Sequence, residues 1–109
     1  MSTRGLISIK YKGILKAKYN HFDSYPSFLG FNLVKELKGK SNILFLKKNF
    51  KNLNFKSDFS FFKNKLFCEW GYIIDLDTYC LEVYKKGVLI KRYSFNNLPS
   101  FKQLRRLEN

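Results

Sequence analysis

Two pairs of strand-like segments, each pair separated by Lys-Gly, constrain the fold more than any other feature of the sequence. The first pair alternates apolar and polar side chains, a pattern of period two that indicates half-buried strands. A two-residue turn that contains glycine closes an antiparallel hairpin. The sequence therefore predicts two β-hairpins, formed by residues 5–11 and 14–19 around Lys12-Gly13, and by residues 81–85 and 88–95 around Lys86-Gly87.

Helix signals lie after each hairpin. An apolar stripe that begins near Pro26 and ends before Gly39 predicts a helix, which either Asp23 or Ser24 caps. Near the end of the chain, Ser100 is placed to cap a short basic helix. We therefore expect one helix between the two hairpins and one after them.

The remaining segments complete the fold prediction. Residues 72–77 indicate a further strand, whereas residues 40–66 fit a second helix, irregular strands or a long ordered loop. Ser41 can cap a short helix at the start of that segment. The predicted fold is α+β: an antiparallel sheet of about five strands, including the two hairpins, packed with two to three helices. The length predicts a single domain over residues 1–109.

The chain is strongly basic, and its charge is uneven. It carries 21 lysine and arginine residues against 8 acidic residues, a formal net charge of +13. Residues 35–66 hold nine lysines and two acids, residues 85–109 hold seven bases and one acid, and residues 67–84 hold four acids and no base. Such a field attracts polyanions. Nucleic acid is the commonest such partner, and acidic proteins and membrane surfaces are the alternatives.

We expect segment 35–66 to supply the main anion-binding surface. Lysines neutralise phosphates, exposed rings stack on unpaired bases, and arginines donate in a fork that fits phosphate. The candidate nucleic-acid-binding residues are Lys47, Lys48, Lys51, Lys56, Phe50 and Phe55 in this segment, Lys16 and Lys18 on the first hairpin, and Arg105 and Arg106 in the last helix. Lys10 is expected to share a solvent-exposed face with Lys16 and Lys18.

A second interpretation of the same residues needs no ligand. Lysines over a phenylalanine core form an ordinary solvated surface. A sequence rich in Lys, Asn, Ile and Phe also arises from the codon usage of an AT-rich genome. No pattern typical of an RRM, a KH domain or a zinc finger is present. The charge therefore indicates a class of partner and not a known nucleic-acid-binding fold.

One loop is a candidate for catalysis. His21 is the only histidine and lies two residues before Asp23, so a Cys-His-Asp constellation requires Cys68 or Cys80 beside it in space. Tyr25 belongs to the same possible functional loop. The alternative interpretation is that the loop packs and caps the following helix, and that both cysteines are buried thiols.

A second candidate is a pair of carboxylates. Asp75 and Asp77 alternate along one strand, so their side chains share a face and resemble pairs that hold Mg²⁺ or divide acid and base chemistry. The alternative is a solvent-facing strand edge that leads into a turn. No P-loop, GxSxG, HExxH or GxGxxG pattern is present. We expect no cofactor and no metal.

Cysteine content and hydropathy indicate the compartment. Cys68 and Cys80 are the only cysteines, which is too few for a disulfide framework. No apolar stretch approaches the ~20 residues of a membrane-spanning helix. We expect a cytoplasmic protein that does not associate with membranes.

Two blocks of the sequence resemble a group of small uncharacterised proteins from phages, prophages and their hosts. The first block is Thr3-Arg4-Gly5-Leu6-Ile7, followed by Tyr19-Asn20-His21-Phe22-Asp23-Ser24-Tyr25-Pro26 and then Leu29-Gly30; the second is Cys68 to Asp77, CEWGYIIDLD. The blocks cover about 25 residues of this chain. The family carries no known activity, but the resemblance implies a phage or mobile-element context in a bacterial host.

These observations lead to two hypotheses of function. The first is a non-enzymatic binding protein that engages RNA or a nucleoprotein complex through lysine-rich surfaces. Because small basic phage proteins often disable a host machine, the resemblance implies an inhibitor of an RNA-guided host defence nuclease, as anti-CRISPR proteins are. The alternative is a small hydrolase or nucleotide-processing enzyme that uses the His21/Asp23 loop.

Overall fold

A five-stranded mixed sheet organises the chain. The computed structural model describes residues 3–54 and 69–109. The strands lie in the order β2-β1-β3-β4-β5 across the sheet. Their bounds are β1 Gly5–Tyr11, β2 Ile14–Asn20, β3 Trp70–Asp75, β4 Cys80–Lys85 and β5 Val88–Ser94.

Both predicted hairpins are present. Lys12 and Gly13 join β1 to β2 with φ angles of 52° and 76°, and Lys86 and Gly87 join β4 to β5 with 50° and 81°. Positive φ at both central residues is the geometry of the tight turn that matches the twist of paired strands. Local turn chemistry therefore fixes four of the five strands.

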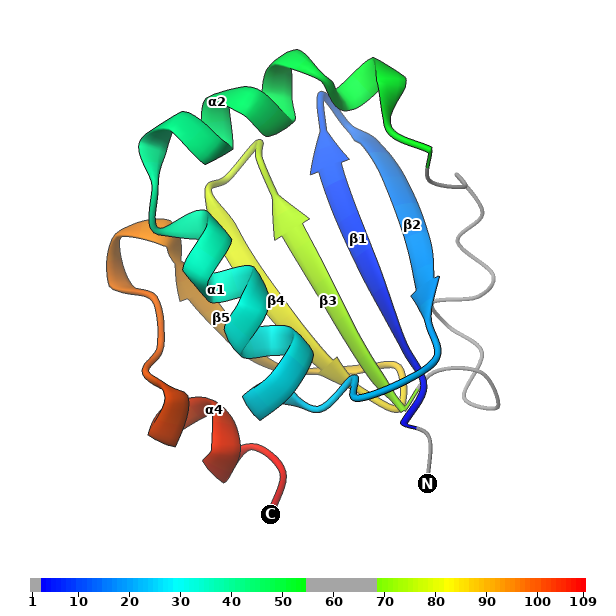
Figure 1. Cartoon of the computed structure of the whole chain (residues 1–109), viewed down its shortest axis with the longest axis vertical. Coiled ribbons are helices and arrows are strands. Elements are labelled where there is room, and N and C mark those ends of the chain that lie inside the picture. The colour runs from blue at the N-terminus through cyan, green and yellow to red at the C-terminus, as the bar shows by residue number, and fades with distance from the viewer. Residues whose placement is uncertain (1–2, 55–68) are drawn as a thin grey trace.

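The helices lie mainly on one face of the sheet (Figure 1). A π-helical turn, η1 (Pro26–Gly30), leads into α1 (Phe31–Leu37), which lies across that face. Helix α2 (Lys40–Lys48) and the 3₁₀ turn η2 (Phe50–Asn52) cross one end of the sheet, and α4 (Phe101–Arg106) lies towards the opposite end. A second 3₁₀ turn, η3 (Phe95–Asn97), follows β5.

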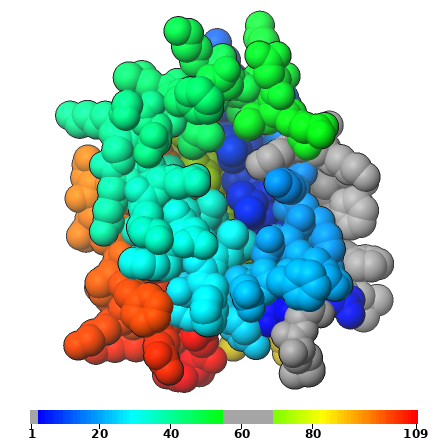
Figure 2. Space-filling view, viewed as in Figure 1, coloured from blue at the N-terminus to red at the C-terminus, as the bar shows by residue number. Residues whose placement is uncertain are grey.

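The main core lies between the sheet and these helices. Tyr72, Leu81, Val83 and Val34 are fully buried within it. Alternate residues of β1 and β3 face this side, which explains why their apolar residues recur with period two. In the space-filling view the helices cover much of this side (Figure 2).

The structure confirms the predicted α+β class: the described residues form five mostly antiparallel strands and three α-helices. One pairing was not anticipated: β1 and β3 run parallel, with Ile7 opposite Tyr72. The third strand begins at Trp70 and ends at Asp75, because residues 76–79 form a turn.

The capping predictions are half right. Ser100 caps α4 and forms a reciprocal capping box with Gln103. Neither Asp23 nor Ser24 caps the helical segment that begins at Pro26, since its N-cap is Tyr25 with no side-chain hydrogen bond. Gly39 ends α1 as predicted but also serves as the N-cap of α2, so Ser41 lies inside that helix.

Within the segment that the sequence leaves undecided, residues 40–52 form α2 and η2. The rest, from residue 55, lies outside the described residues. No helix within residues 3–54 and 69–109 combines the length and the hydropathy needed to span a membrane.

Candidate anion-binding surface

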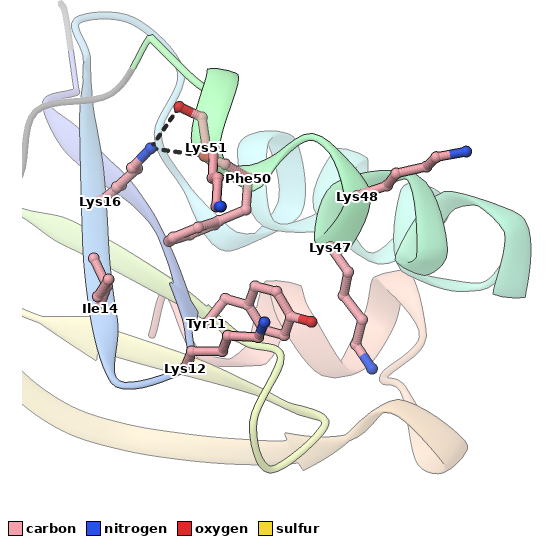
Figure 3. Close-up of a pocket in the computed structure, with 8 residues that line it drawn as sticks. All are labelled: Tyr11, Lys12, Ile14, Lys16, Lys47, Lys48, Phe50 and Lys51. Carbon is pink, nitrogen blue, oxygen red and sulfur yellow. Dashed lines mark hydrogen bonds between the residues drawn. The ribbon is translucent and has the colours of Figure 1, made fainter.

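A hollow of about 450 Å³ lies between the first hairpin and the end of α2 (Figure 3). The hairpin supplies the floor and one wall, and α2 with η2 supplies the other. Its lining is five lysines, two aromatic residues and one isoleucine: Lys12, Lys16, Lys47, Lys48, Lys51, Tyr11, Phe50 and Ile14. We call these eight residues the lysine hollow. Its volume falls in the range of small-molecule and nucleotide pockets.

Two aromatic rings form the apolar part of the lysine hollow. Tyr11 and Phe50 meet edge to face with 5.6 Å between ring centroids. Phe50 is 5% exposed and belongs to the main core. The expectation that Phe50 offers a ring for base stacking is therefore corrected: its ring is packed against β1, and it shapes the hollow from inside.

Two of the five lysines are held by the protein itself. The Lys16 ammonium donates to the carbonyl oxygens of Phe50 (2.7 Å) and Lys51 (3.3 Å), and it lies 4.7 Å from the Phe50 ring centroid. The Lys47 ammonium donates to the Tyr79 hydroxyl. Lys16 thus fastens η2 to the edge strand β2, and its charge offsets the negative end of the helical segment.

The other three lysines have no anionic partner among the described residues. Within residues 3–54 and 69–109, one ion pair forms, between Arg92 and Glu82 (3.7 Å). Lys12 lies 5.4 Å from the Tyr11 ring centroid, and the side chains of Lys48 and Lys51 make no hydrogen bond within those residues. In Figure 3, Lys12 and Lys51 turn towards the two rings, whereas Lys48 extends away from them. Their charges remain available to an external anion.

One carboxylate stands beside the lysine hollow. Asp77 accepts hydrogen bonds from the backbone N–H groups of Lys12 (2.7 Å) and Gly13 (3.0 Å). The bonds from Gly13 and Lys12 lower the pKa of Asp77 below its ordinary value of 3.8, and the charges of Lys10 and Lys47 lower it further. Asp77 therefore stays ionised and joins the first hairpin to the β3–β4 turn.

The proposed carboxylate pair has a structural role instead. Asp75 is buried and accepts hydrogen bonds from the N–H groups of Asp77 (2.9 Å) and Thr78 (3.1 Å), which closes the turn after β3. Asp75 and Asp77 are thus each engaged by backbone donors at the turn that the alternative placed here. Asp75 is buried, however, so the alternative of a solvent-facing strand edge is wrong for this residue. Nowhere in the described parts of the chain do three His, Cys, Asp or Glu residues gather as metal ligands would.

The structure separates the other predicted basic residues. The register pairs Lys10 with Leu15, Lys16 with Ile9 and Lys18 with Ile7. Paired residues point to the same face, so Lys10 lies on the opposite face from Lys16 and Lys18, and the expectation of a shared face is wrong. Arg105 and Arg106 are exposed on α4, at the other end of the molecule from α2 (Figure 1). Phe55 and Lys56 lie outside the described residues.

One exposed ring on α2, the helix that contributes Lys47 and Lys48 to the lysine hollow, was missed by the sequence reasoning. Phe45 in α2 is 64% exposed. Its neighbours at i−2 and i+1, Ile43 and Leu46, are the ones that pack against the core. Lys48, at i+3, lies on the same face as Phe45. If the segment from Ile43 to Phe50 is a helix, its periodicity places Phe45 on the solvent-exposed side. The sequence predicts this exposure only once the segment is known to be helical.

The candidate catalytic loop lies at the opposite end of the sheet from the other reactive groups. His21 is exposed, and its Nδ1 lies 2.9 Å from the Tyr19 hydroxyl. It follows the end of β2 that pairs with Gly5, whereas Cys80 and Asp75 pair with each other at the far end of β3. Six strand residues separate the two ends, which is roughly 20 Å. Asp23 and Tyr25 lie in the same loop as His21. No catalytic constellation of these residues with Cys80, Asp75 or Asp77 therefore forms. Cys68 lies outside the described residues.

Ser24 organises this end of the sheet. Its N–H donates to the Thr3 carbonyl (3.3 Å), its hydroxyl accepts from the Asn20 amide (2.7 Å), and its carbonyl accepts from the buried Tyr72 hydroxyl (2.6 Å). Ser24 itself is fully buried. Segments far apart in the sequence, at Thr3, Asn20 and Tyr72, therefore meet in space around one serine.

Two glycines permit this close packing. A Cβ on Gly5 would lie 2.5 Å from the Ser24 Cβ and 2.9 Å from the Trp70 carbonyl oxygen. A Cβ on Gly30 would lie 3.1 Å from the Tyr72 ring. Packing thus explains why glycine stands at positions 5 and 30. We call the set Gly5, Asn20, Ser24, Gly30 and Tyr72 the Ser24 cluster.

No protein-family model, no curated protein and no solved structure matches this chain. The functional argument accordingly depends on the geometry and charge described above.

Proposed function

We propose that this chain is a non-enzymatic binding protein that engages RNA through the lysine hollow and the adjoining face of α2. The observation that carries the proposal is the set of three lysines, Lys12, Lys48 and Lys51, that line one hollow without an anionic partner in the described residues. Like charges held together cost free energy unless an anion neutralises them. A phosphate backbone supplies such anions at regular spacing.

The charge of the surrounding surface supports the same proposal. Residues 31–52 carry six lysines and one glutamate, and the hairpin of residues 5–20 carries four lysines and no acid. Together these two segments hold most of the net charge of +13, although Lys10 lies on the opposite face of the sheet from Lys16 and Lys18. A concentrated basic field attracts nucleic acid over long range and makes the affinity depend steeply on salt.

The experiment compares two triple variants of equal charge. Lys12, Lys48 and Lys51 become glutamine in one, and the exposed Lys86, Lys91 and Lys102 become glutamine in the other. Binding of an unstructured RNA and of DNA of the same length is measured at two salt concentrations. The first variant should lose affinity more than tenfold at low salt and reduce the slope of log K against log salt by about two, whereas the control should change both much less. Equal losses in the two variants, or wild-type affinity that ignores salt, would contradict the proposal.

A protein partner is the second candidate, and the β5 edge favours it. Val88, Leu89 and Ile90 are exposed by 59%, 46% and 38% on a strand that borders the sheet. Lys91 and Arg92 follow them, so an acidic protein surface with apolar side chains is the complementary partner. With the phage-protein resemblance, this supports a bacterial cytoplasmic nucleoprotein target such as an RNA-guided defence nuclease. Co-purification with such a complex that survives nuclease treatment is the expected result.

A further inference from the structure

We infer that the face of α2 selects single-stranded over double-stranded RNA, because Phe45 provides a stacking platform for an unpaired base on the helix that also supplies lysines to the lysine hollow. The inference rests on the proposed function and names its substrate class. It starts from an unusual feature of α2, which has no buried residue along its nine positions.

The exposed face of α2 combines a ring with cations. Phe45 and Leu44 are each 64% exposed, and Phe45 makes no ring contact within the described residues. Lys48 lies one helical turn after Phe45 on the same face and also lines the hollow. Proteins bind single strands by combining exposed aromatic rings with nearby cations: the cations hold the backbone, and the ring stacks on a base. On α2, Phe45 supplies the ring and Lys48 the neighbouring cation.

Duplex RNA cannot use the same ring. Its bases are stacked on one another and their faces are covered, so a duplex offers Phe45 only phosphates and sugars. The lysines would serve both ligands, because they recognise charge. The ring therefore adds affinity for the single strand alone, and the lysines add affinity for both.

The two contributions respond differently to salt. Replacement of a lysine that contacts phosphate lowers both the affinity and its salt dependence, because fewer counterions are released. Replacement of a stacking ring lowers the affinity and leaves the salt dependence unchanged, since no counterion is involved. Affinity and salt slope together therefore separate stacking from charge.

Leu44→Ala is the matched control for Phe45→Ala. Both side chains are exposed to the same extent on adjacent positions of α2, and both variants remove apolar surface without touching the core. Phe45→Trp keeps a stacking ring. A melting temperature close to the wild type in all three verifies that the fold is intact.

The experiment measures binding of a 12-nucleotide uridine homopolymer and of a 12-base-pair RNA duplex at two salt concentrations. We expect Phe45→Ala to weaken single-strand binding about tenfold with an unchanged salt slope, Phe45→Trp to retain it, and Leu44→Ala to have little effect. Duplex binding should be the same in all four proteins.

The other possible outcomes contradict either the stacking inference alone or the proposed function itself. If Phe45→Ala changes neither ligand, or weakens the duplex equally, the stacking inference fails while RNA binding stands. If Leu44→Ala matches Phe45→Ala, the face is an apolar docking surface for another partner and the inference is overturned. If the wild type binds neither RNA, the proposed function itself fails.

Discussion

The two ends of the sheet use polar groups in opposite ways. At the Ser24 cluster, buried polar atoms are paired within the protein: the Tyr72 hydroxyl with the Ser24 carbonyl, and the Asn20 amide with the Ser24 hydroxyl. At the lysine hollow, Lys12, Lys48 and Lys51 are left without anionic partners in the described residues. Burial makes an unpaired polar group costly, whereas exposure makes it inexpensive. The Ser24 cluster therefore specifies the fold, and the lysine hollow is available for binding.

The same contrast distinguishes segments of the sequence that have a structural role from segments that are candidates for function. At the Ser24 cluster, Gly5, Gly30 and the hydrogen-bonded Ser24 and Tyr72 each have a packing or hydrogen-bonding reason. The lysine hollow is built from segments that look ordinary in sequence. If this division is correct, identical substitutions at the two ends should have very different effects on stability.

Alanine in place of glycine should give the largest difference. A Cβ on Gly5 meets the Ser24 Cβ at 2.5 Å and backbone at 2.9 Å, so Gly5→Ala forces β1 apart from its neighbours. We expect a loss of about 3 kcal/mol in the free energy of unfolding, at the upper end for overpacked cores. Gly39→Ala, at the start of α2, meets only the end of the Asn42 side chain at 3.2 Å, and should cost less than about 1 kcal/mol.

Urea denaturation of both variants measures the difference. Similar losses in the free energy of unfolding of the two variants would contradict the prediction that the Ser24 end is tightly packed while the start of α2 tolerates substitution. The double variant Gly5→Ala with Ser24→Gly should recover part of the stability, because it removes the closest of the contacts.

Removal of a tyrosine hydroxyl should give a smaller difference of the same kind. Tyr72→Phe leaves the buried Ser24 carbonyl without its 2.6 Å partner and should cost about 1–2 kcal/mol. Tyr79→Phe removes a hydroxyl that is bonded to Lys47 at the surface, and water replaces that bond. It should cost about 0.5 kcal/mol or less. Equal destabilisation of the two variants, measured by urea denaturation, would contradict this ranking.

Sequence reasoning succeeded where the structure is determined by neighbouring residues. The turns at Lys12-Gly13 and Lys86-Gly87 and the cap at Ser100 depend on contacts within a few residues, and all three were predicted. The parallel pairing of β1 with β3 joins residues more than 60 positions apart, and no local pattern encodes it. Ser24 was predicted to cap a helix for the same reason, since its actual partners, Thr3 and Tyr72, are distant in sequence.

The candidate site was predicted only in part. Charge is additive along the sequence, so the basic segment was identified correctly, and three of its lysines line the hollow. Which aromatic rings face outward depends on where each residue falls around the helix, and the sequence did not decide whether this segment is helical. As a result Phe50, which is buried, was selected and Phe45, which is exposed, was not.

The smallest expected effect is on the pH dependence of stability, and it concerns Asp77 at the lysine end of the sheet. Hydrogen bonds from the Gly13 and Lys12 N–H groups hold its folded-state pKa below 3.8, so the unfolded chain takes up this proton first as the pH falls. Its stabilising contribution is therefore complete well above pH 3.8 and is lost as the pH falls through the folded pKa.

In Asp77→Asn this contribution is absent at every pH. The melting temperature of the variant should lie below that of the wild type at pH 6 and approach it near pH 2. Curves for wild type and Asp77→Asn that stay parallel from pH 6 to pH 2 would show that the carboxylate does not hold the hairpin turn, and that the lysine end of the sheet is looser than its hydrogen bonds indicate.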